Sequence, residues 1–210
     1  MPRTIYEKPT RTLLKDMLAD WDLKPGQVFT TSRAIEWFKD HYPKLKPGSI
    51  RAHLVQASTN DRNRLHHSAT SESDDLLFKV DLQRYLAENL GCIEAGLTLF
   101  EDEDISGLEY PAGGGRRIDI LAVDKTGSFV VLELKVEKGY DRVVGQLLLR
   151  YMNWVRKELA EPGQRVRGII ICRTMSEDLR LASASIKNVE LFEYQLSVTV
   201  TKVPAVELPV

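Results

Sequence analysis

The stretch that decides the fold is GRRIDILAVDKTGSFVVLELKVEKGYDRVVGQLLLRYMNWVRKEL, residues 115–159. It opens with two runs rich in Val, Ile and Leu, which a short Lys-Thr-Gly segment separates, and it closes with an amphipathic segment. Short runs of β-branched residues favour strands, whereas apolar residues spaced by three and four favour a helix. The stretch therefore predicts a β-hairpin followed by a crossover helix, as in a mixed α/β sheet.

The turn of this hairpin decides which side chains lie side by side. A three-residue loop with Gly127 in the left-handed conformation pairs the residues that flank it, and counting back from the turn places Asp119 opposite Glu133. Because side chains alternate along a strand, Lys135 shares the face of Glu133. The other face is expected to point into the core with Ile118, Ile120, Leu132, Leu134 and Val136. Two carboxylates this close repel each other unless a cation or a proton lies between them.

The type of ligand predicts the type of metal. Asp119 and Glu133 offer oxygen atoms with no Cys or His nearby, which favours Mg²⁺ or Mn²⁺ over zinc, and the carbonyl of Leu134 is a further candidate ligand. Such an ion would polarise a scissile phosphate and lower the pKa of a bound water, while Lys135 stabilises the attacking hydroxide or the pentavalent charge. A Glu-x-Lys pattern alone is weak evidence for such a site, because it occurs on many surface strands. The alternative to a metal site is a buried ion pair.

Strands and helices continue on both sides of the hairpin. Further strands are expected at 96–100, 165–173 and 189–194, with helices at 81–90 and 176–186. Upstream, three short helices are expected: one over residues 10–21, one capped by Thr31 or Ser32, and one capped by Ser49. A polar stretch then precedes LLFKV, residues 76–80, which is expected to be a strand.

Three helices followed by a hairpin with a polar tip are typical of a winged helix-turn-helix, whose third helix reads a DNA groove. On this interpretation the side chains that face DNA are Arg51, His53 and Gln56 on the third helix, and Arg62, Arg64, His66 and His67 on the strand and wing. The segment resembles other small domains with the stretch YPxxKxxSIRxHLxxxSxNDRNRxHH that occur beside nuclease domains. The alternative is a helical domain used for protein contacts.

The charge divides unevenly along the chain. Residues 1–80 carry 13 Lys and Arg against 10 Asp and Glu, whereas residues 81–210 carry 16 against 20. A basic N-terminal part that holds all four histidines suits a phosphate-binding surface, although ordinary solvated faces give the same pattern. With no Gly/Ser-rich linker between them, we expect two domains, residues 1–80 and 81–210, that meet near Val80.

The location is expected to be cytoplasmic, without a membrane anchor. No apolar stretch approaches the roughly 20 residues that cross a bilayer, and the first residues lack the apolar core of a signal peptide. Cys92 and Cys172 lie in apolar surroundings without metal-ligand spacing, so reduced core thiols are expected.

The quoted stretch, with LAENLGCIEAGLTLF upstream and RGIIICRTMSEDLRLASASIKNVELFEY downstream, resembles the catalytic core of PD-(D/E)XK nucleases and, among them, the NucS (EndoMS) family. The resemblance covers roughly residues 81–195. It implies a restriction-endonuclease-like mixed sheet flanked by helices, with Asp119, Glu133 and Lys135 as the catalytic set of a metal-dependent DNA endonuclease.

The resemblance also implies roles outside the hairpin: Glu88 as an extra acidic residue, Gln146 as a catalytic helper, and Arg116, Arg117 and Tyr151 near the DNA substrate. Each of three has a structural alternative, because Glu88 suits a solvated helix face, Gln146 a helix cap and Tyr151 core packing. Two departures limit the transfer. One more residue separates Gln146 from Tyr151 than in the QLxRY pattern, and NucS proteins carry a β-rich N-terminal domain where this sequence predicts helices.

Three functions are compatible with these patterns. The first is a metal-dependent DNA endonuclease that a winged helix delivers to DNA, for repair or for defence. The second is a catalytically silent DNA-binding regulator that keeps the nuclease fold as a scaffold. The third, cleavage of RNA, is disfavoured because nothing resembles an RNA-recognition module. One chain has one active site, so cutting both strands predicts a homodimer.

Overall fold

The computed structural model describes residues 5–24, 27–57, 74–139 and 148–196. The helices are α1 Thr10–Asp20, α2 Thr31–His41, α3 Pro47–Ala57, α4 Asp74–Glu88, the short 3₁₀ helix η2 Leu90–Cys92, α5 Leu149–Glu158 and α6 Glu177–Ser183. The strands are β1 Thr98–Leu99, β2 Glu101–Asp102, β3 Ile105–Ser106, β4 Leu108–Pro111, β5 Arg117–Val123, β6 Phe129–Gly139, β7 Val166–Met175 and β8 Val189–Glu193.

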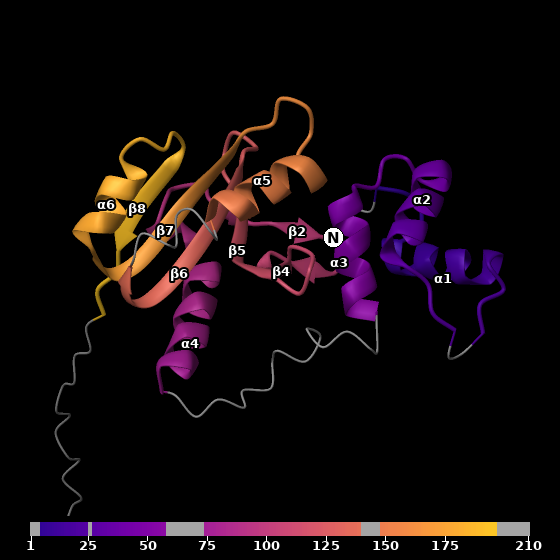
Figure 1. The fold of residues 1–210 in the computed structure, drawn as a ribbon, viewed down its shortest axis with the longest axis horizontal. Helices are drawn as coiled ribbons and strands as arrows, with labels where there is room; N and C mark the ends of the chain where they lie inside the picture. The colour runs from indigo at the N-terminus through magenta and orange to yellow at the C-terminus, as the bar shows by residue number, and fades with distance from the viewer. Residues whose placement is uncertain (1–4, 25–26, 58–73, 140–147, 197–210) are drawn as a thin grey trace, which may run out of the picture.

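A mixed sheet of six strands forms the larger part of the molecule (Figure 1). Its order is β1-β5-β6-β7-β8, with β4 also pairing with β5, and β2 and β3 form a small sheet of their own. β6 pairs in parallel with β7, and β7 with β8, whereas the pairings of β5 are antiparallel. The mixed α/β sheet predicted from the hairpin and crossover is confirmed, although β2, β3 and β4 were not predicted.

Helices cover both faces of this sheet because its central strands are apolar on both sides. On one face α4 packs Leu82 and Leu86 against residues that include Ile120 and Leu132. On the opposite face α5 and α6 pack against residues that include Leu121 and Val131. Ile118 departs from the predicted alternation and joins the cluster on the α5 side, since the register of β5 with β6 ends at Ile120 and Leu132. The side chain of Val136 lies outside the described residues.

The N-terminal part is the predicted set of three helices, with its own apolar cluster around Leu13, Met17 and Phe38. The starts of two helices differ from the prediction. Thr30 caps α2 by accepting a hydrogen bond from the N–H of Arg33, one residue before the predicted cap. α3 begins at Pro47, because proline suits a first helical turn, where the N–H has no partner within the helix.

The strand predicted over residues 76–80 is wrong, because α4 runs through these residues. Leu82, Leu86 and Leu90, which follow this run at a helical spacing of four, pack together in one cluster. The helix that this spacing indicates begins earlier, at Asp74, and so includes the short apolar run. The boundary predicted after Val80 therefore falls within α4. The predicted wing contacts Arg62, Arg64, His66 and His67 lie outside the described residues.

α3 lies between the other two N-terminal helices, α1 and α2, and the sheet (Figure 1). Its Ile50 belongs to the N-terminal cluster, whereas Ala52, two residues later, belongs to the cluster on the α5 side of the sheet. A further contact links α1 to the β2–β3 turn, where Glu103 accepts hydrogen bonds from the N–H and hydroxyl of Thr10 at 2.6 and 3.0 Å. The N-terminal helices are thus docked on the sheet.

The prediction that His53 faces DNA is wrong. Its side chain is 2% exposed, and its Nδ1 lies 3.3 Å from a carboxylate oxygen of Asp104. His53 is buried because it points from α3 toward the β2–β3 turn. Arg51 points to the sheet domain as well and is paired with Glu158 on α5. Gln56 is exposed, so its DNA contact stays a prediction.

Among the described residues, no helix is both long enough and apolar enough to cross a membrane.

The two cysteines differ in exposure. Cys172 is buried in β7 as predicted, but Cys92 is exposed. The core-thiol prediction is wrong for Cys92, since η2 turns Leu90 inward and leaves Cys92 at the surface.

Replacing Gly48 tests how tightly α3 is docked. A Cβ at this position would lie 2.8 Å from Cδ2 of Leu159 and 3.0 Å from the carbonyl oxygen of Glu158. We expect Gly48→Val to lower the free energy of unfolding by about 1–3 kcal/mol, a typical cost of overpacking, measured by denaturant unfolding. Gly91→Val is the matched control, because no atom lies within 4 Å of a Cβ there. Equal stability of both variants would contradict the close contact of α3 with α5.

Candidate active site

The hairpin turn brings Asp119 and Glu133 close together, although the paired register of the two strands ends one residue before them. Gly127 has φ of 80°, and the N–H of Asp124 donates to the carbonyl oxygen of Ser128 at 3.0 Å, so the loop contains three residues. The register that follows pairs Val123 with Phe129 and continues to Ile120 and Leu132, the residues next to the two acids. Both acidic side chains are buried, with relative exposures of 6% and 4%.

The two carboxylates are neutralised unequally. Asp119 accepts from the N–H of Leu134 at 2.7 Å through Oδ2, and from Nζ of Lys79 at 2.8 Å through Oδ1. Glu133 accepts from Nζ of Lys135 at 2.7 Å through Oε1, whereas its buried Oε2 has no hydrogen-bond partner among the residues that the structure describes. A buried oxygen of this kind is costly unless a further group binds it.

The electrostatics of Glu133 reflect this shortage of positive charge. Burial raises the pKa of Glu133 to about 7, and the neighbouring Asp119 adds to the rise, although Lys135 and Lys79 oppose it. A divalent cation between the carboxylates would reverse this effect because it favours the ionised form. The donor set of carboxylate oxygens and the unpartnered Oε2 therefore fits Mg²⁺ or Mn²⁺.

Lys79 and Gln83, which the sequence analysis missed, are the residues by which α4 reaches the site. The Gln83 amide donates at 2.6 Å to the carbonyl oxygen of Asp119 and at 2.6 Å to the carboxylate of Glu109. Burial opposes the charge of Lys79, but Asp119, Glu133 and Glu109 raise its pKa above the usual value. The spacing of four would have placed Lys79 and Gln83 on one helix face, had residues 76–80 not been read as a strand.

The residues proposed from the resemblance differ in where they lie. Glu88 is exposed at the end of α4, nine residues from Lys79 and so on the opposite side of the helix, and the structure does not bring it to the site. Gln146 lies outside the described residues. Leu134 contacts Asp119 through its N–H, and its carbonyl stays a predicted ligand.

Tyr151, on α5, lies close to the carboxylates from the other face of the sheet. Burial raises the pKa of Tyr151 to about 12, with Glu133 and Asp119 adding to the rise and with Arg116 and Arg150 opposing it. Its hydroxyl is therefore protonated near neutral pH and can donate a hydrogen bond. The side chain also packs in the α5 cluster, so the predicted substrate role and the packing alternative are compatible.

The two predicted arginines are placed differently. Arg117 donates to the carbonyl oxygen of Glu109 at 2.7 Å, so part of its guanidinium is used within the fold. Arg116 is exposed at the end of the loop that joins β4 to β5. Asp119, Glu133, Lys135 and Tyr151 are thus brought together, with Arg116 nearby.

Two family models match the chain. The model of the endonuclease NucS C-terminal domain matches residues 78–195, and that of a domain of unknown function, DUF7669, matches residues 9–86. Endonuclease NucS from Pyrococcus horikoshii is 32% identical over 101 residues, which are 47% of this chain and 35% of that protein. Endonuclease NucS from Bifidobacterium animalis is 36% identical over 96 residues, 45% of this chain and 36% of that protein.

Solved structures also match the chain, at lower sequence identity than these relatives. The match with a repair endonuclease from Pyrococcus abyssi covers 56% of this chain and 46% of that protein's chain, with 27% identity and a TM-score of 0.45. An EndoMS–dsDNA complex covers 58% of this chain and 46% of its own, with 23% identity and a TM-score of 0.47. The chain spans about a third of the length of the curated relatives it matches.

Proposed function

The chain belongs to the family of the endonuclease NucS C-terminal domain, and on this premise we propose that it is a metal-dependent DNA endonuclease. The observation that carries the proposal is the pair of buried carboxylates, Asp119 and Glu133, with an unpartnered oxygen on Glu133 and the ammonium of Lys135 beside it. The relatives are named endonucleases, which supports the same reaction class. The proposed reaction is hydrolysis of a phosphodiester bond.

We assign each residue of the site a separate role in this reaction. Asp119 and Glu133, with the carbonyl of Leu134, would hold Mg²⁺ or Mn²⁺. The chemistry that such a cation supplies is polarisation of a phosphoryl oxygen and a lower pKa for water. The N–H of Leu134 fixes the orientation of Asp119. Lys135 carries positive charge to the place where negative charge develops on the phosphorus centre, and Tyr151 can donate a hydrogen bond there.

We also propose that the N-terminal helices contribute to DNA binding and that two copies of the chain act together on duplex DNA. Gln56 is exposed at the end of α3, and Arg51 lies at the contact with α5, which supports a DNA path along this junction. A dimer would supply the second active site that cutting both strands requires. Repair and defence are both compatible with this activity.

A second function also has an observation in its favour. Lys79 and Lys135 neutralise Asp119 and Glu133 without any metal, as in a buried ion-pair network. Such a network suits a DNA-binding regulator that keeps the nuclease fold only as a scaffold. The two functions differ in whether a divalent cation binds the carboxylates.

The test is cleavage of end-labelled DNA by the full chain. Duplex, mismatched, branched and single-stranded DNA, with an RNA of the same sequence, are incubated with Mg²⁺, Mn²⁺ or EDTA. Cleavage of at least one DNA with either metal, and none in EDTA, is the expected result. DNA binding that is equally strong in EDTA, without cleavage of any substrate, would favour the regulator.

Lys79 offers a prediction that concerns the metal alone. Its ammonium pairs with the same Asp119 carboxylate that a cation would bind. We expect Lys79→Gln to tighten Mn²⁺ binding about three- to tenfold, because about 1 kcal/mol of competing ion pairing and repulsion is removed. Titration followed by electron paramagnetic resonance measures the Kd. Lys157→Gln, at an 82% exposed lysine of α5, is the matched control. Unchanged or weaker binding in Lys79→Gln would contradict this competition.

A further inference from the structure

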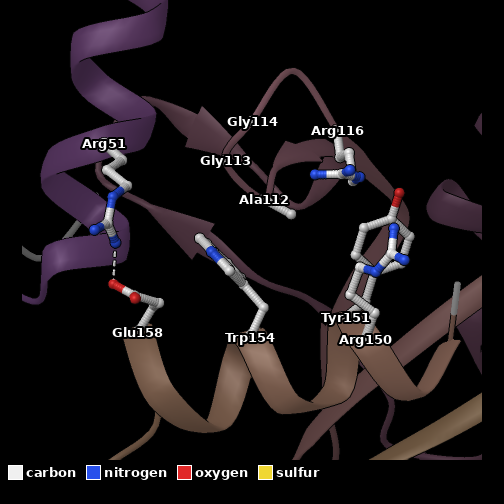
Figure 2. Close-up of a pocket in the computed structure, with 9 residues that line it drawn as sticks. All are labelled: Arg51, Ala112, Gly113, Gly114, Arg116, Arg150, Tyr151, Trp154 and Glu158. Atoms are coloured by element: carbon white, nitrogen blue, oxygen red, sulfur yellow. Dashed lines mark hydrogen bonds and ion pairs between the residues drawn. The ribbon is translucent and has the colours of Figure 1, made fainter. Parts of the chain in front are cut away.

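A pocket of about 290 Å³ lies where α3, α5 and the β4–β5 loop meet (Figure 2). Arg51 enters it from α3, Arg116 from the loop, and Arg150 from α5, with the indole of Trp154 between them (Figure 2). Its volume is just below the range for small-ligand sites, roughly 300–1,000 Å³. The pocket therefore suits one small group rather than a folded partner.

The charge of the pocket favours an anion. Three guanidinium groups face one carboxylate, that of Glu158, and this carboxylate is already paired with Arg51. Among the side chains that the structure describes, Arg116 and Arg150 have no ion-pair partner. Guanidinium groups bind phosphate oxygens through paired, charge-assisted hydrogen bonds. A phosphate group is the anion that a nuclease substrate offers at every nucleotide.

The indole of Trp154 gives the pocket an apolar surface beside these charges. One side of it packs against Tyr110, with ring centroids 6.3 Å apart at 57°. Gly113 lies beside the indole, since a Cβ there would be in van der Waals contact with Nε1 of Trp154, and its φ of 76° favours glycine at this position. A Cβ on Gly114 would lie 2.9 Å from Nη1 of Arg116, so this glycine makes room for the guanidinium. A planar base can stack on such an aromatic surface.

The pocket and the candidate active site share Tyr151. This side chain lines the pocket. Besides burial, the carboxylates of Asp119 and Glu133 raise the pKa of its hydroxyl, and the guanidiniums of Arg116 and Arg150 lower it. Tyr151 therefore links the pocket to the candidate active site, which suits a strand that spans both.

We infer that this pocket binds the nucleotide next to the scissile phosphate, with Arg116 and Arg150 at its phosphate and Trp154 against its base. This inference rests on the proposed nuclease function and specifies how its substrate strand is held. Because Arg51 comes from α3, the N-terminal helices complete one wall of the pocket. The bound strand therefore contacts both parts of the chain.

The test follows the indole N–H signal of Trp154 by nuclear magnetic resonance in EDTA, so that cleavage does not enter. The full ¹⁵N-labelled chain is titrated with thymidine trinucleotide, with the same trinucleotide lacking its bases, and with inorganic phosphate. Loss of one signal in Trp154→Phe assigns it. We expect the trinucleotide to shift this signal and to leave those of Trp21 and Trp37 unchanged, with binding about tenfold weaker when the bases are absent.

Charge variants separate the phosphate contact from general attraction. We expect Arg116→Gln and Arg150→Gln each to weaken trinucleotide binding about tenfold, while Arg180→Gln, on α6, has no effect despite the same change in charge. An unmoved Trp154 signal, or equal binding of phosphate and trinucleotide, would overturn the inference. Should the wild-type chain cleave DNA while Trp154 stays unmoved, only the pocket assignment fails. A Trp154 response without cleavage on any substrate would reject the nuclease proposal and leave a nucleotide site.

Discussion

Asp119→Asn and Lys135→Ala are each expected to slow metal-dependent DNA cleavage by at least about a hundredfold, measured as the single-turnover rate on the best substrate. Asn keeps the shape of Asp119 and can still accept from the N–H of Leu134, so the loss would come from the missing charge. Lys135 is 29% exposed beside Glu133, and its removal leaves the developing negative charge without a nearby ammonium. Both variants are expected to bind DNA in EDTA as the wild type does.

Two exposed positions provide controls of the same chemical kind. Asp178→Asn, in the first turn of α6, and Lys157→Ala, on α5, remove the same charges away from the carboxylates. Both are expected to cleave at rates close to that of the wild type. If Asp119→Asn kept its rate, with unchanged metal dependence, the site assignment would be wrong and the carboxylates would be structural.

Glu133→Gln is expected to raise the midpoint of thermal unfolding at pH 8 and to leave it nearly unchanged at pH 5. The pKa of Glu133 is raised to about 7 in the folded chain from the ordinary 4.5, first by burial and then by Asp119. Between these values the unfolded state loses its proton while the folded state keeps it, so stability falls as pH rises toward 7 and stays lower above it. Gln removes this cost, which is about 3 kcal/mol and thus roughly 10 °C in the midpoint.

The same variant should lose the stabilisation that a metal gives. Adding Mn²⁺ is expected to raise the midpoint of the wild type, because a ligand that binds only the folded state stabilises it, and Glu133→Gln is expected to show a much smaller rise. Glu88→Gln, at the exposed end of α4, is the matched control and should follow the wild type at both pH values and with Mn²⁺. A Glu133→Gln variant that is destabilised equally at pH 5 and pH 8 would show that the carboxylate stabilises the fold.

The central pair of acids could be predicted because it depends on local rules. A three-residue turn at Gly127 and the alternation of side chains along two strands are enough to place Asp119 beside Glu133. Lys79 could not be found by the same means, because a short apolar run gives no period and the helix that contains it becomes evident only downstream.

The direction in which the side chains of α3 point could not be predicted, because it depends on packing against residues that are distant in the sequence. A helix with Arg51, His53 and Gln56 on it looks the same in sequence whether those side chains face DNA or a neighbouring domain. In the fold, Arg51 pairs with Glu158, the β2–β3 turn covers His53, and Gln56 stays exposed. Contacts between residues more than fifty positions apart decided the outcome.

The position of α3 limits how freely the two parts of the chain could be exchanged in evolution. Ile50 belongs to one apolar cluster and Ala52 to the other, so a single helix completes both. Joining the sheet to a different N-terminal module would remove α3 and leave the surface of α5 around Val155 and Glu158 without this cover. A different N-terminal module would therefore need its own contact for this surface, because one helix completes both clusters here.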